Sequence, residues 1–593
     1  NSLSSILNNQ CQAQRISPLI IINRKSKSDD NFKPSNFLEQ LNEKNTDLIM
    51  DLNRDILQLT KIRLPGLKNI NSQLFTLFCQ ILQFAGNLQE VHISQSQLSA
   101  SQYKELFDVL GNNITLLELM SNNISDDITP NLQQLIMQQP HLESLKLSDN
   151  KLSPKAAQLI TQSIRQAQTK GQRIKTLHLG GNPLGNSGIQ QVCKNLAGVA
   201  SLTSLGLRNC QFDTLKPLKE LILHPACELQ DLQLRKNNFK DFNDFCGCLV
   251  KTKLRVLELH DCGVNSENLM FLGQFLAQNQ TLHALNLSQN LFGDFAAEPI
   301  CLIIKNCRSL TTLSLEQCQL TSKFVLTLLQ AFSKQRVSLS GISFAKNSLG
   351  DEAMPLLGKA VASGQISSLD LQQNLISAAG MQQFCQQLFS QQVKLRHFDV
   401  SGNIIGDSGL SSLCSILQLN KSIQRLFLTD CGISEVGANS LKDCLTQNNT
   451  LCQMQYGGQG KSANQIPKQI KIEIDRKLRK NQLQQKNEKI ELETQNLQKR
   501  EFDLAPVLPP MGIEAPPGLF MHERPQSYQI LEEFGFNSFD SFGSVQSFQN
   551  VEMMREIVSY DNLVQMQKEE KLYEVKQEQK RKMAYRLSEK KQE

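Results

Sequence analysis

Leucine and other aliphatic residues recur along the chain in one fixed pattern of apolar and polar positions. In an 11-residue segment, the first, fourth, sixth and eleventh positions are apolar and the ninth is Asn or Cys. The pattern is plain at Leu142, Leu145, Leu147, Asn150 and Leu152, and it returns about every 28 residues. The alternation between the fourth and sixth positions predicts a short strand with buried leucines.

Thirteen copies of this segment can be placed, which indicates a repeat array rather than a string of unrelated domains. The ninth position is Asn or Cys in every copy except the first, where it is Ser96. A buried Asn side chain can satisfy backbone groups where the chain turns out of a strand, and a small Cys fits the same place. The copies begin at Leu88, Ile114, Leu142, Ile174, Leu202, Leu229, Leu254, Leu282, Leu310, Leu339, Ile366, Leu395 and Ile423.

A stretch with helical spacing follows each strand segment, as Ala156, Leu159, Ile160 and Ile164 illustrate. Each repeat is therefore predicted to be one strand followed by one helix. A single unit cannot bury its apolar face alone, so the repeats must stack on one another.

The residues after the ninth position carry a second signal, which reads NPLGNSG over 182–188 and NIIGDSG over 403–409. Residues 290–294 and 347–351 follow it in part. With the repeat length and the helical backs, the chain resembles the ribonuclease-inhibitor class of leucine-rich-repeat proteins from residue 88 to about residue 456. The resemblance implies an α/β horseshoe solenoid with a parallel inner sheet and outer helices, and it implies protein binding.

The repeat pattern divides the chain into six parts. Residues 88–456 are the predicted solenoid of about 13 repeats, and glycines at 457, 458 and 460 end it. Residues 1–58 are a polar N-terminal extension, and 59–87 are an N-terminal cap or degenerate repeat. After the solenoid we expect a basic helix over 461–500, a Pro- and Phe-rich extended segment over 501–548, and a charged C-terminal helix over 549–593.

Charge alternates along the region that follows the solenoid. Residues 461–500 contain eleven Lys or Arg and five acidic residues, whereas residues 501–567 contain ten acidic and two basic residues. Phenylalanines stand in this polar setting without a core of their own. They are interpreted as a docking segment for a partner protein, with a linker that has incidental aromatics as the alternative. The residues proposed for this contact are Phe534, Phe536, Phe539 and Phe542.

Composition favours an intracellular protein. The 16 cysteines have no paired spacing, and many occupy the small buried position of the repeat, which predicts reduced structural thiols. No apolar run approaches the ~18 residues that span a bilayer. A net charge of +6 over 593 residues is mild, so we expect neither nucleic-acid nor membrane binding, and a cytoplasmic location.

Motifs for catalysis were sought without success. The sequence has no Gly-rich phosphate loop, and Cys246-x-Cys248 lacks the second ligand pair of a zinc site. We therefore expect no enzyme activity, no small-molecule substrate, no metal and no cofactor. One alternative stays open, because GTPase-activating proteins for the nuclear-transport GTPase are similar in architecture and use an arginine near their first repeats. Arg63 is the candidate, although the region after the solenoid is mixed in charge rather than acidic.

The third, fifth and seventh positions of each segment, and many eighth positions, are predicted to face the hollow of the solenoid. The leading hypothesis is a scaffold or adaptor within a large assembly, because the chain is similar to leucine-rich-repeat subunits of ciliary axonemal complexes. A soluble regulator, either the GTPase activator or an inhibitor-like binder, is the runner-up. Candidate contacts on this face are Arg208, Arg235, Lys236, Glu258, His260, Arg425 and Phe427.

Overall fold

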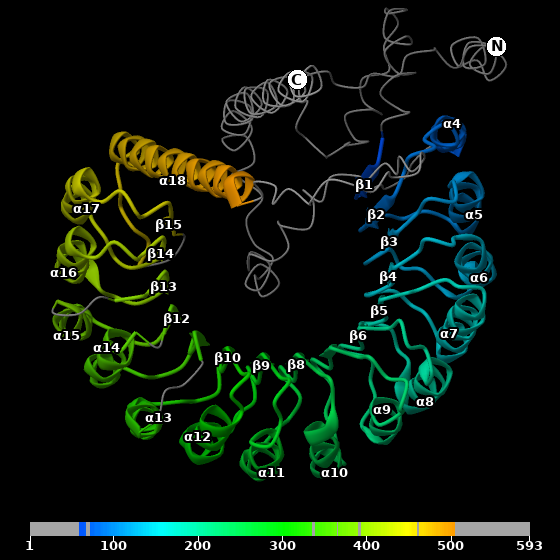
Figure 1. Cartoon of the computed structure of the whole chain (residues 1–593), viewed down its shortest axis with the longest axis horizontal. Coiled ribbons are helices and arrows are strands. Elements are labelled where there is room, and N and C mark those ends of the chain that lie inside the picture. The colour runs from blue at the N-terminus through cyan, green and yellow to red at the C-terminus, as the bar shows by residue number, and fades with distance from the viewer. Residues whose placement is uncertain are drawn as a thin grey trace, which may run out of the picture. The chain divides into compact units, whose positions relative to one another are not determined.

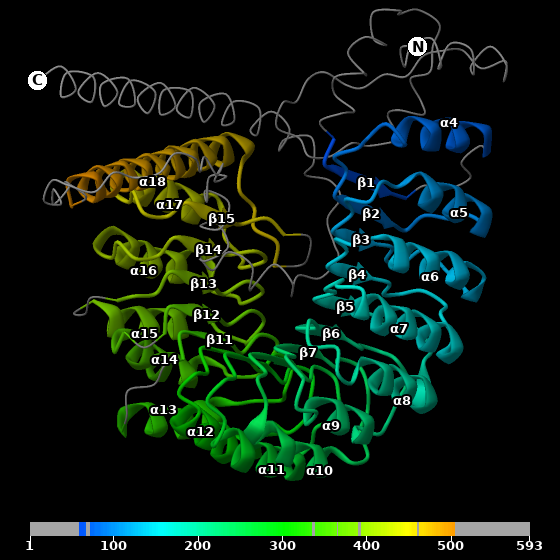
Figure 2. The ribbon, with the colours of Figure 1, turned by 45° about the vertical axis from the view of Figure 1, so that its right-hand side comes forward.

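The computed structural model describes residues 59–66, 72–334, 339–364, 366–389, 393–458 and 462–503 of the chain. Apart from residues 497–503, these ranges belong to one compact unit. Strands line the inner side of the unit and helices its outer side, in chain order (Figures 1 and 2). The predicted leucine-rich-repeat solenoid of parallel strands and helices is thereby confirmed.

One 15-stranded parallel sheet runs through the described residues, and each strand pairs with its neighbours in the sequence. Parallel neighbours require a crossover connection, which the helix of each repeat supplies. The less regular segments on either side of the thirteen copies also contribute strands, β1 and β15. The strands are β1 Lys61–Pro65, β2 Glu90–Ser94, β3 Leu116–Glu118, β4 Ser144–Lys146, β5 Thr176–His178, β6 Ser204–Gly206, β7 Asp231–Gln233, β8 Val256–Glu258, β9 Ala284–Asn286, β10 Thr312–Ser314, β11 Gly341–Ser343, β12 Ser368–Asp370, β13 His397–Asp399, β14 Arg425–Phe427 and β15 Gln453–Gln455.

Several helices begin at a polar cap, namely α5, α7, α11, α15 and α17, and the helices bury one apolar face. In α7, Pro154 takes the first helical position and the Ser153 hydroxyl accepts hydrogen bonds from two backbone N–H groups. Ile160 and Ile164 are buried against the sheet side as the spacing predicts. The helices are α4 Ser72–Leu82, α5 Ala100–Val109, α6 Thr129–Gln138, α7 Pro154–Thr169, α8 Gly185–Leu196, α9 Lys216–Ile222, α10 Phe242–Cys246, α11 Ser266–Leu276, α12 Ala297–Asn306, α13 Ser322–Lys334, α14 Met354–Ala362, α15 Ala378–Leu388, α16 Gly406–Leu419, α17 Glu435–Gln447 and α18 Lys468–Asp503.

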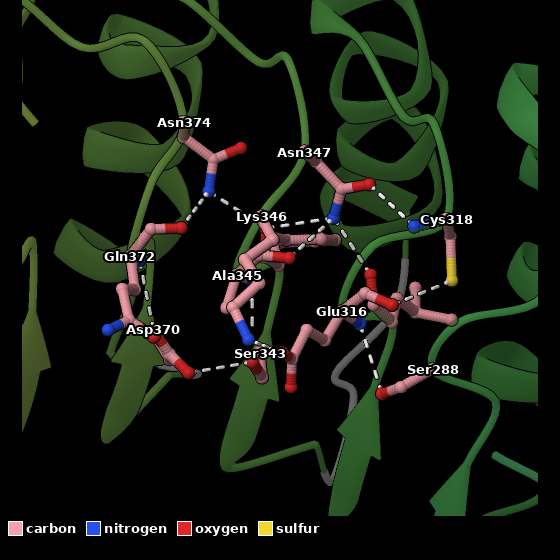
Figure 3. Close-up of polar contacts among 12 residues, drawn as sticks. Ser288, Glu316, Cys318, Ser343, Ala345, Lys346, Asn347, Asp370, Gln372 and Asn374 are labelled. Atoms are coloured by element: carbon pink, nitrogen blue, oxygen red, sulfur yellow. Dashed lines mark hydrogen bonds and ion pairs between the residues drawn. The ribbon is translucent and has the colours of Figure 1, made fainter. Parts of the chain in front are cut away.

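The ninth-position asparagines form a buried ladder that links successive repeats. The Asn347 amide donates to the carbonyls of Leu315 and Phe344, at 2.8 Å each. Its side-chain oxygen accepts from the N–H groups of Cys318 and Leu320, at 2.9 and 3.0 Å (Figure 3). One side chain thus satisfies backbone groups in two adjacent repeats, as the pattern predicted.

Cysteine fills the same position with a weaker hydrogen-bond donor. The Cys318 thiol donates to the Leu287 carbonyl of the preceding repeat at 3.4 Å. Every cysteine within the described ranges is a free thiol. Burial raises the pKa of the Cys318 thiol to about 12, so it stays protonated and acts as a donor. The ninth-position cysteines are all buried, as predicted, at residues 210, 262, 318 and 431.

The turn out of each strand depends on the eighth position as well, a feature that the sequence analysis did not identify. Asp149, Lys236, Asp261 and Lys346 all have φ between 53° and 58° in the left-handed region. In the repeats of β5 and β13 the corresponding residues are glycines with φ of 71° and 69°. Non-glycine residues in this conformation are costly by roughly 1–2 kcal/mol, so the ladder and the parallel sheet must hold them there.

The Gly-Asp that recurs in the second signal has a structural explanation. The Asp407 carboxylate accepts from the Ser434 backbone N–H at 2.8 Å and from the Ser434 hydroxyl at 2.5 Å. Asp351 binds Ser377 in the same way. Each aspartate therefore fixes the N-terminal cap of the helix in the following repeat.

The predicted basic helix is α18, and its first half closes the C-terminal end of the sheet. Ile470, Ile474 and Leu478 are buried on one side of the helix. Asn481 donates to the carbonyls of Asn448 and Leu451, at 3.0 and 2.9 Å. The helix thus covers the edge after β15 and satisfies backbone carbonyls there.

Candidate functional site

The inner face of the sheet is built from the residues that flank each buried strand leucine. In β4, Leu145 is fully buried, whereas Ser144 and Lys146 are half-buried on the opposite side. Because the strands are in register, equivalent residues form columns along the face. The face is mostly polar, with apolar members such as Leu116, Val256 and Phe427, and its chemistry changes from one group of strands to the next.

Strands β1 to β4 carry a chain of alternating charges across the face. Lys61 pairs with Glu90 at 2.6 Å, and His92 lies 3.0 Å from Glu90 and 3.4 Å from Glu118. Lys146 completes the chain at 3.4 Å from Glu118. The hydrogen bond from His92 and the charge of Lys146 hold the pKa of Glu118 at about 2, despite its burial. This network is internally neutralised, and it leaves little demand for an outside partner.

The side chain of Arg208, one of the candidate residues, extends across β5 toward Asp149, which lies two repeats earlier in the chain. Its guanidinium forms an ion pair with Asp149. The path lies over Gly180 and Gly181, where an added Cβ would come within 2.4 Å of Arg208 and 2.1 Å of Asp149. The two glycines therefore make room for this contact.

Arg235 and Glu258 meet on the neighbouring strand segments of β7 and β8. The Arg235 Nε and the Glu258 Oε2 lie 2.9 Å apart. Glu258 is only 6% exposed, and burial raises the pKa of its carboxyl. Asp231 at the start of β7 accepts from the Ser204 hydroxyl at 2.8 Å and from the Gln233 amide at 3.1 Å. Burial raises its pKa also.

Unmet hydrogen bonding on the inner face is concentrated at β7 and β8. Within the described strands and the turns that follow them, the buried polar side-chain atoms of this face that lack a hydrogen-bond partner are Asp231 Oδ1, Arg235 Nε and Glu258 Oε2. The Arg235 and Glu258 atoms are close but not aligned as donor and acceptor. An unsatisfied buried polar atom costs about 1–3 kcal/mol, so an incoming partner that supplied donors would be favoured here.

The inner face at β10 to β12 is different, because its polar groups are paired among themselves (Figure 3). Lys346 pairs with Glu316 at 2.6 Å. The Ser343 hydroxyl donates to Asp370 at 2.8 Å, and the Gln372 N–H donates to the other carboxylate oxygen at 3.0 Å. This part of the face is already satisfied.

Two carboxyls lie side by side where this network meets β13. Asp370 and Asp399 are partners in the parallel ladder. Burial, together with the Asp370 carboxyl, raises the pKa of Asp399 to about 7. Beyond β13, Arg425 and Phe427 of β14 stand next to His397 and Asp399 in the register.

The candidate residues thus fall into separate places. Arg208, Arg235, Lys236, Glu258 and His260 lie on or directly after β6, β7 and β8, and the structure brings Arg235 and Glu258 into contact. Lys236 is exposed on the turn after β7.

Other candidate positions are distant from this group or undescribed. Arg425 and Phe427 are on β14, six strands farther along the sheet. Arg63 lies on β1 opposite His92. Residues 534, 536, 539 and 542 lie outside the described residues.

Asp149 and Gln233 also belong to the central group, although the repeat pattern did not single them out. Asp149 occupies an eighth position, and the glycines at 180 and 181 are the signal that could have revealed its reach to Arg208. Over the described ranges, no group of His, Cys, Asp and Glu side chains is arranged to hold a metal ion. None of the helices there combines the length and the apolar character needed to cross a membrane.

The fold and the inner face define the class of protein, a leucine-rich-repeat α/β solenoid. A family model described as "Leucine Rich repeat" matches residues 138–160, 278–301 and 391–414. These matches fall on three of the repeats seen in the structure.

Sequence comparison relates the chain to particular leucine-rich-repeat proteins. The chain is 26% identical over 387 residues to ribonuclease inhibitor of Mus musculus, covering 63% of this chain and 83% of that protein. Ribonuclease inhibitor of Sus scrofa is also 26% identical, over 390 residues and the same shares. NACHT, LRR and PYD domains-containing protein 14 of Mus musculus is 28% identical over 255 residues, 42% of this chain and 25% of that protein.

Among solved structures, a TLR13–ssRNA13 complex has a TM-score of 0.41 at 16% identity, covering 68% of this chain and 57% of that chain. The yeast Rad7–Elc1 complex has a TM-score of 0.38 at 16% identity, with 72% of this chain and 93% of that chain covered. The sequence comparisons confirm the resemblance to ribonuclease-inhibitor-type leucine-rich-repeat proteins.

Proposed function

We propose that the chain is a non-enzymatic scaffold that binds another protein through its inner face, with the centre of the contact at β6 to β8. The group formed by Asp231, Arg235 and Glu258 carries this proposal, because it contains three buried side-chain atoms that lack a hydrogen-bond partner. Asp231 and Arg235 are partly exposed on this face, so a charged side chain of the partner can reach their accessible atoms. The similarity to ribonuclease inhibitor and to NACHT proteins supports a protein as the ligand.

The setting of this scaffold is the finer part of the proposal. We infer a cytoplasmic subunit of a large assembly, with a ciliary or flagellar axoneme as the suggested place. The phenylalanines at 534, 536, 539 and 542 and the β14 residues Arg425 and Phe427 would add further contacts. Sedimentation of a native extract tests the assembly, because a free chain would migrate near 66.7 kDa.

Site-specific photo-crosslinking tests the inner face directly. A photoreactive residue at Gln233, in the full chain and in its native extract, should give a discrete protein adduct. The matched control is the same residue at Lys323, which is exposed on the outer helix α13. Adding Asp231→Ala to the Gln233 variant should reduce the adduct by about tenfold, since a buried polar contact is worth about 1–3 kcal/mol.

Two results would contradict the proposal. Equal adducts at Gln233 and Lys323 would indicate random collisions. An adduct at Gln233 that ignores Asp231→Ala would place the contact elsewhere on the face.

A second candidate is an inhibitor-like binder that captures one soluble enzyme, and the coverage of 83% of mouse ribonuclease inhibitor favours it. A ribonuclease is then the first protein to test. Titration with the full chain should abolish ribonuclease activity at a one-to-one ratio under this candidate, and leave it unchanged under the scaffold proposal.

A further inference from the structure

The side of α18 that faces away from the repeats is densely cationic. Lys468, Arg476, Arg479, Lys480 and Lys486 are all exposed. At 3.6 residues per turn they fall within roughly 120° of one another around the helix axis. The buried side chains of the cap lie on the opposite side, so this cationic face points away from the contact with the last repeat.

Acidic residues of the same helix segment are engaged elsewhere. Glu473 pairs with Lys442 of α17 at 3.7 Å, and Asp475 accepts from the Tyr456 hydroxyl at 2.5 Å. Both partners belong to the repeats or to the end of the sheet. Glu488 accepts a hydrogen bond from within the helix, one turn back. None of these acids is in a described ion pair with the five cations of the face.

Several cations that the structure describes on the repeats form ion pairs across neighbouring repeats. Examples are Lys61–Glu90, Lys146–Glu118, Lys175–Glu143, Lys240–Asp213, Lys253–Glu228 and Lys346–Glu316. The described ion pairs include none of the five cations of the α18 face.

This arrangement is unfavourable for the helix on its own. Arg476 is three residues from Arg479 and four from Lys480, and like charges at these spacings repel one another. Lys468 is the first residue of the helix, where the helix dipole disfavours a cation. A negatively charged partner would relieve both effects.

The face also has an apolar member. Ile472 is 53% exposed, and it stands one turn from Lys468 on one side and one turn from Arg476 on the other. A phosphate backbone offers nothing apolar to cover it, whereas a polypeptide can place an aliphatic side chain between its acids. The chemistry therefore favours a polypeptide over a nucleic acid.

We propose that the outer face of α18 is a second docking surface, which takes an acidic segment of a partner protein. The surface is independent of the inner face, because it lies on the cap and uses none of the residues of β6 to β8. Its cations would pair with Glu or Asp side chains, while Ile472 contacts an aliphatic side chain between them.

The test measures binding of the full chain to a fluorescent poly-glutamate peptide of defined length. The variant Arg476→Glu, Arg479→Glu, Lys480→Glu should weaken binding by at least about tenfold, since three attractive contacts become repulsive. The affinity of the wild type should also fall as salt rises. The matched control is Lys155→Glu, Lys323→Glu, Lys359→Glu, which makes the same change of net charge at exposed helix positions.

Each outcome either supports or overturns the docking surface on α18. Loss in the α18 variant and not in the control supports the docking surface. Equal loss in both variants would overturn it, because net charge alone would explain the binding. Tighter binding of an oligonucleotide of equal charge, or of vesicles with anionic lipid, would overturn it in favour of another ligand. A thermal melt of each variant checks that the repeats remain folded. Ile472→Ser should weaken binding of a peptide that carries leucine between its glutamates, and it should leave binding of poly-glutamate unchanged.

Discussion

The inner faces at β6 to β8 and at β10 to β12 are made by the same repeat, yet their polar groups are arranged differently. At β10 to β12, Glu316, Lys346 and Asp370 find partners within the face. At β7 and β8, Asp231 and Glu258 each retain a buried oxygen without a hydrogen-bond partner, although Glu258 forms an ion pair with Arg235. The backbone and the ladder are alike in both, so the difference lies wholly in side chains that the repeat leaves variable.

This difference separates structural from functional residues. A repeat protein must keep the positions that bury leucine and asparagine, because neighbouring repeats depend on them. It is free to vary the inner face. Buried polar groups that lack hydrogen-bond partners lower the stability of the fold, and a bound partner can offset that loss.

The largest expected effect on stability concerns the asparagine ladder, which the two regions share. Asn347→Ala should lower the free energy of unfolding by about 3 kcal/mol, because several backbone groups lose their partner at once. Asn237→Ala in the β7 repeat should be comparably damaging, since it loses bonds to the Leu207 and Leu234 carbonyls. Urea unfolding measures both. Ser348→Ala, at an exposed neighbouring position, is the control, and a similar loss there would contradict the role of the ladder.

The second prediction concerns pH at the edge of the satisfied region. The pKa of Asp399 is raised to about 7, so the folded state binds its proton more tightly than the unfolded state does. Stability is therefore full below the ordinary pKa of an aspartate and declines as pH rises toward 7. Asp399→Asn should stabilise the protein by about 2 kcal/mol more at pH 8 than at pH 4.

Unfolding in urea at the two pH values checks this expectation for Asp399. The mutant keeps an oxygen that can accept from the Ser401 N–H, so the local hydrogen bond is retained. Glu298→Gln on the exposed side of α12 serves as the matched control. A stability difference that is independent of pH in both proteins would mean that Asp399 is not perturbed.

The third prediction sharpens the comparison by removing the ion pair of the unsatisfied region. Replacing Arg235 by Met and Glu258 by Leu should raise stability by about 1 kcal/mol, because a buried pair with poor geometry is often worth less than apolar packing. The same variant should lose the protein adduct at Gln233. A variant that is more stable but no longer gives the adduct would show that the pair serves binding. A variant that is less stable would show that the pair serves the fold.

Sequence alone predicted the repeat fold because its determinants recur in register. The leucines and the ninth-position residue of each copy specify the strand, and one copy can be checked against the next. The contact between Arg208 and Asp149 has no such redundancy. It depends on the absence of a Cβ at Gly180 and on the direction of one long side chain, neither of which the pattern encodes.

The C-terminal cap was also only partly predictable. The sequence after residue 460 indicated a basic helix, but it did not show that this helix closes the sheet. Asn464 accounts for part of that closure, because it accepts from the N–H groups of Cys431 and Ile433 at 3.0 Å each. Asn464 thus accepts the hydrogen bonds that a ninth-position asparagine accepts in other repeats. Because it lies outside the repeat pattern, comparison of the copies could not predict this role.

The smallest expected effect concerns the Lys346–Glu316 pair of the satisfied region. The side chains are 38% and 26% exposed, so water screens their attraction. Replacing Lys346 by Met should cost only about 0.5 kcal/mol, and 1 M salt should remove even that difference. The protein adduct at Gln233 should be unchanged, because a satisfied pair offers nothing to a partner. Unfolding in urea at low and high salt gives the first quantity and crosslinking gives the second. A reduced adduct at Gln233 would show that the partner reaches β11, and the contact would then extend over both regions rather than the unsatisfied one alone.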